Sequence, residues 1–317
     1  MDTQEEPLMA ASIVLSKVLR LPAVADYAAW VVPVHDEFHI WINKPLERRT
    51  RQFKVDASYE FTEQESLPLI VAGTVWSGRS FILTAADLNG QPVVAETDTN
   101  GILLWQQPLE CSQPYRWPAP ACGRTPLVVW QSEQGRVDVA DVSRNGMAQL
   151  GSIAVKGPPL SLAVARDSVW AAWSDQSGVF AVEANDSGVK HYQLTDTYYS
   201  EVGAGRCGDG VAMAWARGGS AFLTEKHAGA AFQKTIELEL GEATGGSLRV
   251  VEGDQPLVHA WRGYSDEGET PRVVSVVTGP ATAGVTIEGL IYSVVNHRGT
   301  LVTIGENEMK FFKVEPR

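Results

Sequence analysis

The sequence predicts an all-β protein folded as a seven-bladed β-propeller, and three observations support this prediction. Short apolar runs of strand length alternate with turns rich in Gly, Asp, Asn and Ser. A tryptophan or glycine follows such a run at a nearly constant interval along the chain. The last repeat is one strand short, whereas the N-terminus carries a strand without a repeat of its own. A period of roughly 40–50 residues built from short strands is typical of propellers with four-stranded antiparallel blades.

The repeating unit is clearest at residues 168–185, SVWAAWSDQSGVFAVEAN, which read as a β-hairpin with a tryptophan near the end of its first strand. We expect this tryptophan to fill the core between neighbouring blades. The interval between aligned markers is 42 to 46 residues, except for one of 57 between the second and third markers. The aligned markers are, in chain order, Trp30, Gly73, Trp130, Trp173, Trp215, Trp261 and Gly305.

Each unit is long enough for four strands, and the fourth unit shows them most plainly. Its predicted strands are PLSLAVARDS, VWAAWSD, GVFAVEAN and VKHYQLTD. The last unit contains LIYSVVNHRG, LVTIGENE and MKFFKVEP, after which the sequence stops. We therefore expect the N-terminal run LMAASIVLSKV to supply the outer strand of the last blade, because such a clasp removes a free sheet edge. On this interpretation residues 1–317 form a single domain.

Composition limits the classes of function. The chain has 317 residues, 44% of them hydrophobic and 20% charged, which is typical of a globular protein. Its formal net charge of −12 argues against nucleic acid or an anionic membrane as the main partner, because phosphate binding needs basic surfaces. The basic run ERRTRQFK at 47–54 is interpreted as a solvated strand edge rather than a binding patch. No apolar run is long enough to span a bilayer, and the acidic N-terminus is unlike a signal peptide. A cytoplasmic protein is therefore expected.

The three cysteines do not form a disulfide framework, since their number is small and odd. Cys122 and Cys207 each lie eight residues before a marker tryptophan and are each followed by glycine. We expect them to be equivalent small residues before an inner hairpin turn. A disulfide between Cys111 and Cys122 remains an alternative. The extra length at 98–121 carries Trp105, Tyr115 and Trp117, and forms either a contact loop or a cover over its own blade edge.

Part of the repeat resembles a known family. The run AWSD at 172–175, followed by VFAVEANDSG at 179–188, resembles blades of the sialidase-like (Asp-box-like) bacterial propellers. The resemblance implies a propeller with a ligand site over its central channel. The family's Asp-box, S-x-D-x-G-x-T-W, is not met, and DTNGILLW (98–105) and NDSGVKHY (185–192) are distant variants of it. The Arg-Ile-Pro motif of sialidase active sites is absent, so no catalytic residue is carried over.

Motifs for metals and cofactors are weak. HDEFH at 35–39 would place two histidines on one face of a helix, but it falls at a hairpin turn, where four residues span about 13 Å. ETDTNG at 96–101 lacks the spaced ligands of a calcium loop and is interpreted as a solvated turn. GEATGGSLRV at 241–250 lacks the lysine of a phosphate-binding P-loop. We predict neither a metal site nor a cofactor.

Propeller geometry gives a better guide to the site. Loops between the second and third strands of each blade, and the links between blades, are expected to open on one face around the channel. The strongest cluster is the long loop RGYSDEGETPR at 262–272. The predicted ligand-binding residues are Arg262, Tyr264, Asp266, Glu267, Asp175, Arg217, Asp36 and Tyr199. The wider set adds His35, Trp76, Arg79, Gln131, Glu133, Ser174, Tyr198, Glu201 and Glu306.

Two functions remain open on the sequence alone. The first is a binding module that presents its loop face to a protein or a carbohydrate, in line with the weak catalytic motifs. The second is an enzyme, a glycoside hydrolase or lyase, with carboxylates and arginines at the mouth of the channel. A buried pair of carboxylates, one with a strongly raised pKa, would favour the enzyme. The oligomeric state is not determined by the sequence.

Overall fold

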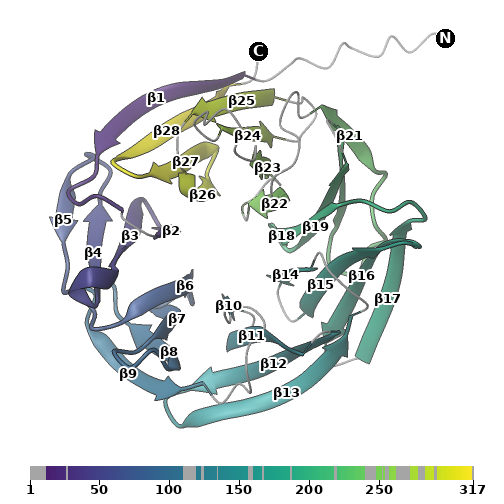
Figure 1. Cartoon of the computed structure of the whole chain (residues 1–317). Coiled ribbons are helices and arrows are strands. Elements are labelled where there is room, and N and C mark those ends of the chain that lie inside the picture. Colours follow the sequence, from purple (N-terminus) through teal and green to yellow (C-terminus); the bar gives the residue numbers. More distant parts are fainter. Residues whose placement is uncertain are drawn as a thin grey trace.

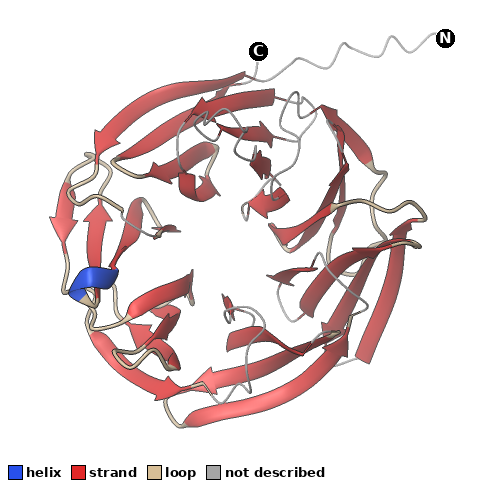
Figure 2. Cartoon of the chain, in the orientation of Figure 1, coloured by secondary structure: helices blue, strands red, loops and turns tan. Residues whose placement is uncertain are grey.

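The structure is a computed structural model of the whole chain. It describes residues 12–25, 28–109, 119–122, 125–133, 135–155, 160–165, 168–185, 188–217, 220–239, 248–251, 253, 257–261, 272–277, 283–288 and 291–315. The described residues form strands joined by turns, with one short 3-10 helix, η1 (Pro45–Glu47) (Figure 2). Within these residues, no helix has the length and apolar character needed to cross a membrane.

The strands form seven four-stranded antiparallel sheets, numbered here in chain order. Sheet 1 is β2 (Ala29–Val34), β3 (Glu37–Lys44), β4 (Arg49–Val55) and β5 (Phe61–Glu63). Sheet 2 is β6 (Ile70–Trp76), β7 (Phe81–Ala86), β8 (Pro92–Thr97) and β9 (Leu103–Pro108). Sheet 3 is β10 (Ala119–Cys122), β11 (Pro126–Glu133), β12 (Arg136–Ser143) and β13 (Gly146–Ala154). Sheet 4 is β14 (Leu160–Ala165), β15 (Ser168–Asp175), β16 (Gly178–Asn185) and β17 (Gly188–Thr195).

The remaining sheets complete the ring. Sheet 5 is β18 (Glu201–Cys207), β19 (Gly210–Arg217), β20 (Ser220–Lys226) and β21 (Ile236–Glu239). Sheet 6 is β22 (Leu248–Val251), β23 (Leu257–Trp261), β24 (Arg272–Val277) and β25 (Ala283–Glu288). Sheet 7 is β26 (Ile291–His297), β27 (Thr300–Gly305), β28 (Glu308–Glu315) and β1 (Ser12–Arg20). Figure 1 shows the sheets arranged around a common centre, with the first strand of each sheet innermost. The predicted β-propeller with four-stranded antiparallel blades is confirmed.

The hairpin predicted at 168–185 is β15 and β16, paired in register from Val169 with Ala184 to Asp175 with Gly178. Every residue of β15 between its two ends is buried. This pattern arises because both faces of the second strand contact neighbouring sheets, so the run is apolar throughout. Trp173 is 3% exposed and packs with sheet 3 residues such as Val129. The predicted core role of the marker tryptophans is confirmed for Trp130, Trp173 and Trp215, which are all buried.

The alignment of the first two units was wrong by one strand. Trp30 lies in β2 and Gly73 in β6, which are first strands, whereas the five later markers lie in second strands. The first and second strands are both apolar runs followed by a turn, so they look alike in sequence. Gly73 has its own packing reason, because a Cβ there would lie 2.7 Å from Cδ of Pro120 on β10. In the corrected alignment, β3 and β7 end at Lys44 and Ala86, and the exceptional 57-residue interval disappears.

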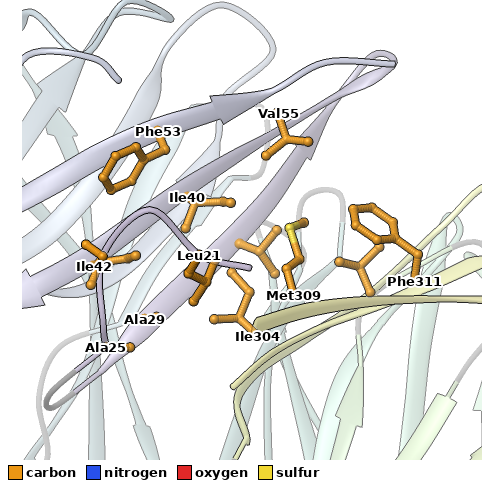
Figure 3. Close-up of a cluster of buried hydrophobic side chains, with 13 residues drawn as sticks. Leu21, Ala25, Ala29, Ile40, Ile42, Phe53, Val55, Ile304, Met309 and Phe311 are labelled. Carbon is orange, nitrogen blue, oxygen red and sulfur yellow. The ribbon is translucent and has the colours of Figure 1, made fainter. Parts of the chain in front are cut away.

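The N-terminal strand closes the ring as predicted. β1 pairs antiparallel with β28 from Ser12 with Glu315 to Arg20 with Glu308, and it is the outermost strand of sheet 7 (Figure 1). The chain then enters sheet 1 through a link whose amides, at Leu21 and Ala25, donate to carbonyls of residues 307 and 306, both at 2.8 Å. Figure 3 shows the core at this junction. It joins residues of sheets 1 and 7, including Ile40, Phe53, Met309 and Phe311.

The predicted equivalence of two cysteines is also confirmed. Cys122 ends β10 and Cys207 ends β18, which are the first strands of sheets 3 and 5. Cys207 is buried, and Cys122 is half-buried with a pKa raised by that burial. Cys111 lies outside the described residues, so the alternative of a disulfide with Cys122 stays a prediction.

Candidate binding face

The antiparallel order of each sheet divides its loops between two faces of the ring. Loops between second and third strands, and links from one sheet to the next, lie on one face, called here the 2–3 face. Loops between first and second strands lie on the opposite face, called the 1–2 face. The described loops of the 2–3 face include residues 45–48, 87–91, 176–177 and 306–307, and its described links include 21–25 and 196–200.

Asp175 lies on the 2–3 face, at the turn between β15 and β16. Its Oδ1 accepts hydrogen bonds from the amide of Ser177 at 2.8 Å and from the Ser177 hydroxyl at 2.5 Å. Ser174 beside it is fully buried, and its hydroxyl donates to the carbonyl of Gly178 at 3.1 Å. The same hydroxyl accepts the amide of Tyr199 at 3.1 Å. The turn and the following link are therefore held together as one unit.

The two tyrosines of this link have different environments. The ring of Tyr199 is half-buried against Phe222 and Trp215, with centroid distances of 5.5 and 6.4 Å. Tyr198 is 43% exposed. Tyr199 therefore anchors the link to sheet 5, and Tyr198 is the aromatic side chain that this link presents to solvent.

Glu201 and Arg217 lie at the same end of sheet 5. Glu201 begins β18 and pairs with Ala216, the neighbour of Arg217 at the end of β19. Burial raises the pKa of the half-buried Glu201 carboxyl, and a 3.4 Å hydrogen bond from the Leu248 amide partly opposes this rise. Arg217 is exposed. This region thus combines an exposed guanidinium, an exposed phenol and a partly desolvated carboxyl.

Asp36 and three other residues that were predicted on the 2–3 face lie on the opposite, 1–2 face. Asp36 and His35 connect β2 to β3. Trp76 ends β6 and Arg79 lies in the connection from β6 to β7, so all four belong to the 1–2 face. This error follows from the misaligned first two units. Asp36 pairs there with Arg298 from the equivalent turn of sheet 7, and Nε2 of His297 lies 2.7 Å from the carbonyl oxygen of residue 35.

The other predicted residues have mixed outcomes. Gln131 is buried, and Glu306 is exposed with its carbonyl bound to the Ala25 amide. The side chain of Glu133 is not among those described. The cluster Arg262, Tyr264, Asp266 and Glu267 lies outside the described residues, so its role stays a prediction.

Three apolar side chains that were not predicted from the sequence are exposed on the 2–3 face. Leu46, in η1, is 99% exposed, and Leu88, in the equivalent loop of sheet 2, is 50% exposed. Val24, in the link before sheet 1, is 43% exposed, and its carbonyl accepts a 2.5 Å hydrogen bond from Nζ of Lys44. The turn signals Pro45 and Asn89-Gly90 would have revealed these loops, had the first two units been correctly aligned.

The weaker motifs also have structural explanations. The basic run at 47–54 includes β4, which is the third strand of sheet 1 rather than its edge, and the charges of Arg49, Arg51 and Lys54 are paired. Arg51 contacts Glu63 at 2.7 Å, Lys54 contacts Glu37 at 3.1 Å, and Arg49 pairs with Glu47.

Asp98 accepts the amides of residues 100 and 102, as expected of a solvated turn. Trp105 lies in strand β9 and not in a loop, with its indole N–H donated to Glu96. Tyr115 and Trp117 are not among the described residues.

The two histidines of HDEFH have different environments, because His35 is exposed in the turn between β2 and β3. His39 lies in β3, 4% exposed, and burial lowers its pKa to about 4. Among the described residues, no three His, Cys, Asp or Glu side chains gather as metal ligands would.

Comparisons with known proteins support the fold and no family. No protein-family model matches the sequence, and no curated protein matches it significantly. The sialidase-like resemblance therefore has no support. The structure is similar to a chain in the crystal structure of the mitotic checkpoint complex, with a TM-score of 0.59, 12% identity, and coverage of 99% of this chain and 98% of that one. It is also similar to the six-bladed, fucose-recognising lectin of the fungus Aleuria aurantia, with a TM-score of 0.52, 8% identity, and coverage of 88% and 96%.

Proposed function

We propose that the chain is a single-domain, seven-bladed propeller that binds a protein partner through its 2–3 face. The observation that carries the proposal is the full exposure of Leu46, with Leu88 and Val24 exposed on neighbouring elements of the same face. Apolar side chains at the tips of loops on a rigid scaffold are typical of interaction sites. Similarity to a chain from a protein complex supports this proposal at the level of fold only.

Two exposed arginines on this face favour acidic side chains on a partner, although Glu47 and Glu306 are exposed on the same face. Arg48 lies two residues after Leu46 and is exposed in a left-handed conformation, with φ of 52°. Arg217 is exposed on the same face, at sheet 5. Arginine is enriched in protein interfaces, whereas the net charge of this chain as a whole is −12. A partner with acidic side chains around an apolar contact would match this arrangement.

The test compares a double variant on the 2–3 face with a control variant at an exposed leucine elsewhere. Leu46→Asp with Leu88→Asp changes the 2–3 face, and Leu150→Asp changes a 61% exposed leucine on β13, the outermost strand of sheet 3. Tagged forms of wild type and both variants serve as baits in affinity enrichment from the source cells. We expect a partner that is lost with the double variant and kept with Leu150→Asp. Retention by the double variant would contradict the proposal.

A carbohydrate ligand is a second candidate, favoured by the exposed ring of Tyr198 near Asp175 and Arg217. Sugar binding commonly combines an aromatic surface with a few polar groups. Thermal-shift measurements with a panel of mono- and oligosaccharides test it, since a ligand of the native state raises the melting temperature. A rise in melting temperature with one sugar would support this candidate if it disappears in Tyr198→Ala and persists in Val189→Ala. Val189 is the control, because it is 52% exposed on β17, the outermost strand of sheet 4.

The enzyme alternative depends on Glu201, whose pKa is raised by burial. A glycoside hydrolase needs two carboxyl groups flanking the bond. Hydrolysis of a glycoside panel by wild type but not by Glu201→Gln would replace the binding proposal with this alternative.

A further inference from the structure

Several buried polar atoms that have no hydrogen-bond partner among the described residues lie in one seam, between sheets 1 and 2. They are Nε2 of His39, Nε1 of Trp41, Oγ1 of Thr74 and Oγ1 of Thr97. His39 and Trp41 come from β3 of sheet 1, while Thr74 and Thr97 come from β6 and β8 of sheet 2. Buried polar side chains almost always have a partner, so a group of such atoms needs an explanation.

Phe81 of β7 brings these side chains together. Its ring centroid lies 4.7 Å from the imidazole of His39 and 4.7 Å from the indole of Trp41. Thr97 is directly opposite Phe81 in the β7–β8 pairing, and Trp76 is opposite it on β6. Directly opposed residues point to the same side of a sheet, so Thr97 faces sheet 1 together with Phe81. Thr74, two residues from Trp76, faces the same way.

The seam is closed to solvent and its polar atoms complement one another. Trp41 is 1% exposed, Thr97 is fully buried, and both Trp41 and Phe81 belong to the apolar core between the two sheets. The indole N–H can only donate, the threonine hydroxyl can donate and accept, and a neutral imidazole nitrogen can do either. Burial keeps His39 neutral at pH 7, because it lowers the histidine pKa to about 4.

Charged neighbours do not satisfy the imidazole. Oε2 of Glu37 lies 3.8 Å from Nε2 of His39, which is beyond hydrogen-bond distance. That carboxylate instead pairs through Oε1 with Nζ of Lys54 at 3.1 Å. A small polar molecule inside the seam would supply the partner that Nε2 of His39 lacks among the described residues.

We propose that this seam is a binding site for ordered water, held by Nε2 of His39, Nε1 of Trp41 and Oγ1 of Thr97. A buried water typically makes about three hydrogen bonds to groups of this kind. The hydroxyl of Thr74 is the candidate contact for a second water. This hydration site adds to the direct hydrogen bonds between sheets 1 and 2, such as the one from the Asn43 side-chain amide to the Val71 carbonyl at 2.8 Å, and it is independent of the binding face.

The first test is a high-resolution crystal structure of the whole chain. We expect density for water within about 3.2 Å of at least two of the three named atoms. Well-ordered side chains with no density between them would overturn the proposal. Density for a larger molecule would also overturn it, because the seam would then be a ligand pocket.

The second test uses Thr97→Val, which keeps the side-chain shape and removes the hydroxyl. If Oγ1 binds water, the equilibrium constant for folding should fall about tenfold; if Oγ1 has no partner, it should rise, because an unsatisfied polar group has been removed. Thr50→Val is the matched control, since Oγ1 of the buried Thr50 lies 2.7 Å from Oδ1 of Asn43 and 2.7 Å from the Leu69 carbonyl oxygen, and its hydroxyl donates to one of them. A fall for Thr50→Val together with a rise or no change for Thr97→Val would overturn the proposal.

Discussion

Nζ of Lys226 lies 3.8 Å from Oε2 of Glu183, across the seam between sheets 5 and 4. Only 8% of the lysine side chain and 12% of the glutamate side chain are exposed. The ammonium group also lies 5.6 Å from the ring centroid of Trp170 and 5.9 Å from that of Tyr192. The Tyr192 hydroxyl donates to the same carboxylate oxygen at 2.8 Å, and burial together with this contact raises the pKa of Tyr192 to about 12. The charge of each partner is thus stabilised by the other.

Replacing Lys226 with methionine should destabilise the protein, because it leaves the Glu183 carboxylate buried without its cation. We expect a loss of about 3 kcal/mol in the free energy of unfolding, measured by urea denaturation. Adding Glu183→Gln to Lys226→Met should recover part of this loss, since no isolated charge remains. Equal stabilities of the single and double variants would show that the ion pair is unimportant.

Stability should decrease in acid because of His39. Its pKa is about 4 in the folded protein and about 6.5 in an unfolded chain, so the unfolded state binds a proton first as the pH falls. The contribution of the neutral imidazole is complete above pH 6.5 and is lost progressively between pH 6.5 and 4. Its size is about 3 kcal/mol if His39 alone is considered.

The pH effect is isolated by comparing wild type with His39→Gln, which cannot take up that proton. We expect the difference between their free energies of unfolding to shrink as the pH falls from 7 to 4. A difference that stays constant over this range would contradict the assignment to His39.

Gly178, which follows the Asp175 turn, should not tolerate alanine. A Cβ at this position would lie 2.1 Å from the carbonyl oxygen of Thr195. Gly146 is the matched control, because its φ of 141° equals the 142° of Gly178 to within a degree, while nothing lies within 4 Å of its Cβ position. We expect about 1 kcal/mol of backbone strain in Gly146→Ala and at least about 3 kcal/mol in Gly178→Ala. Similar melting temperatures for Gly146→Ala and Gly178→Ala would contradict this, because they would mean that the turn before Gly178 moves to make room for the Cβ.

The stability of the closed ring should depend on the side chains of β1 that face the core. Leu19 packs against the core shared by sheets 7 and 1, whereas Val18, its neighbour, is 45% exposed. Leu19→Ala should therefore cost about 1–2 kcal/mol, and Val18→Ala should change stability by no more than about 0.5 kcal/mol. Calorimetry on both variants provides the measurement. Equal losses would indicate that β1 contributes through its backbone pairing alone.

Much of the candidate face could not be predicted, and the reason is specific. Asp175, Tyr199 and Arg217 were placed on the 2–3 face because their units were aligned correctly. Asp36 was placed there wrongly, because β2 and β3 are both apolar runs that end in a turn. Leu46 was missed for the same reason. Which of two such strands is innermost depends on the strand order of the whole sheet, β2-β3-β4-β5, which the local pattern around the marker does not contain.

The sequence by itself determined the strand periodicity, the four-stranded unit and the closure by β1. These properties depend on local alternation and on turn residues, which act over a few positions of the chain. Only the tertiary structure decided which loops share a face, and that His39, Trp41 and Thr97 meet in one seam. The alternation of apolar and polar residues shows which side of a strand is buried. It does not show which residue of the neighbouring sheet packs against that side, and here Thr97 lies about 60 residues after His39 and Trp41 in the sequence. Contacts of that kind are set by packing between sheets and leave no local pattern.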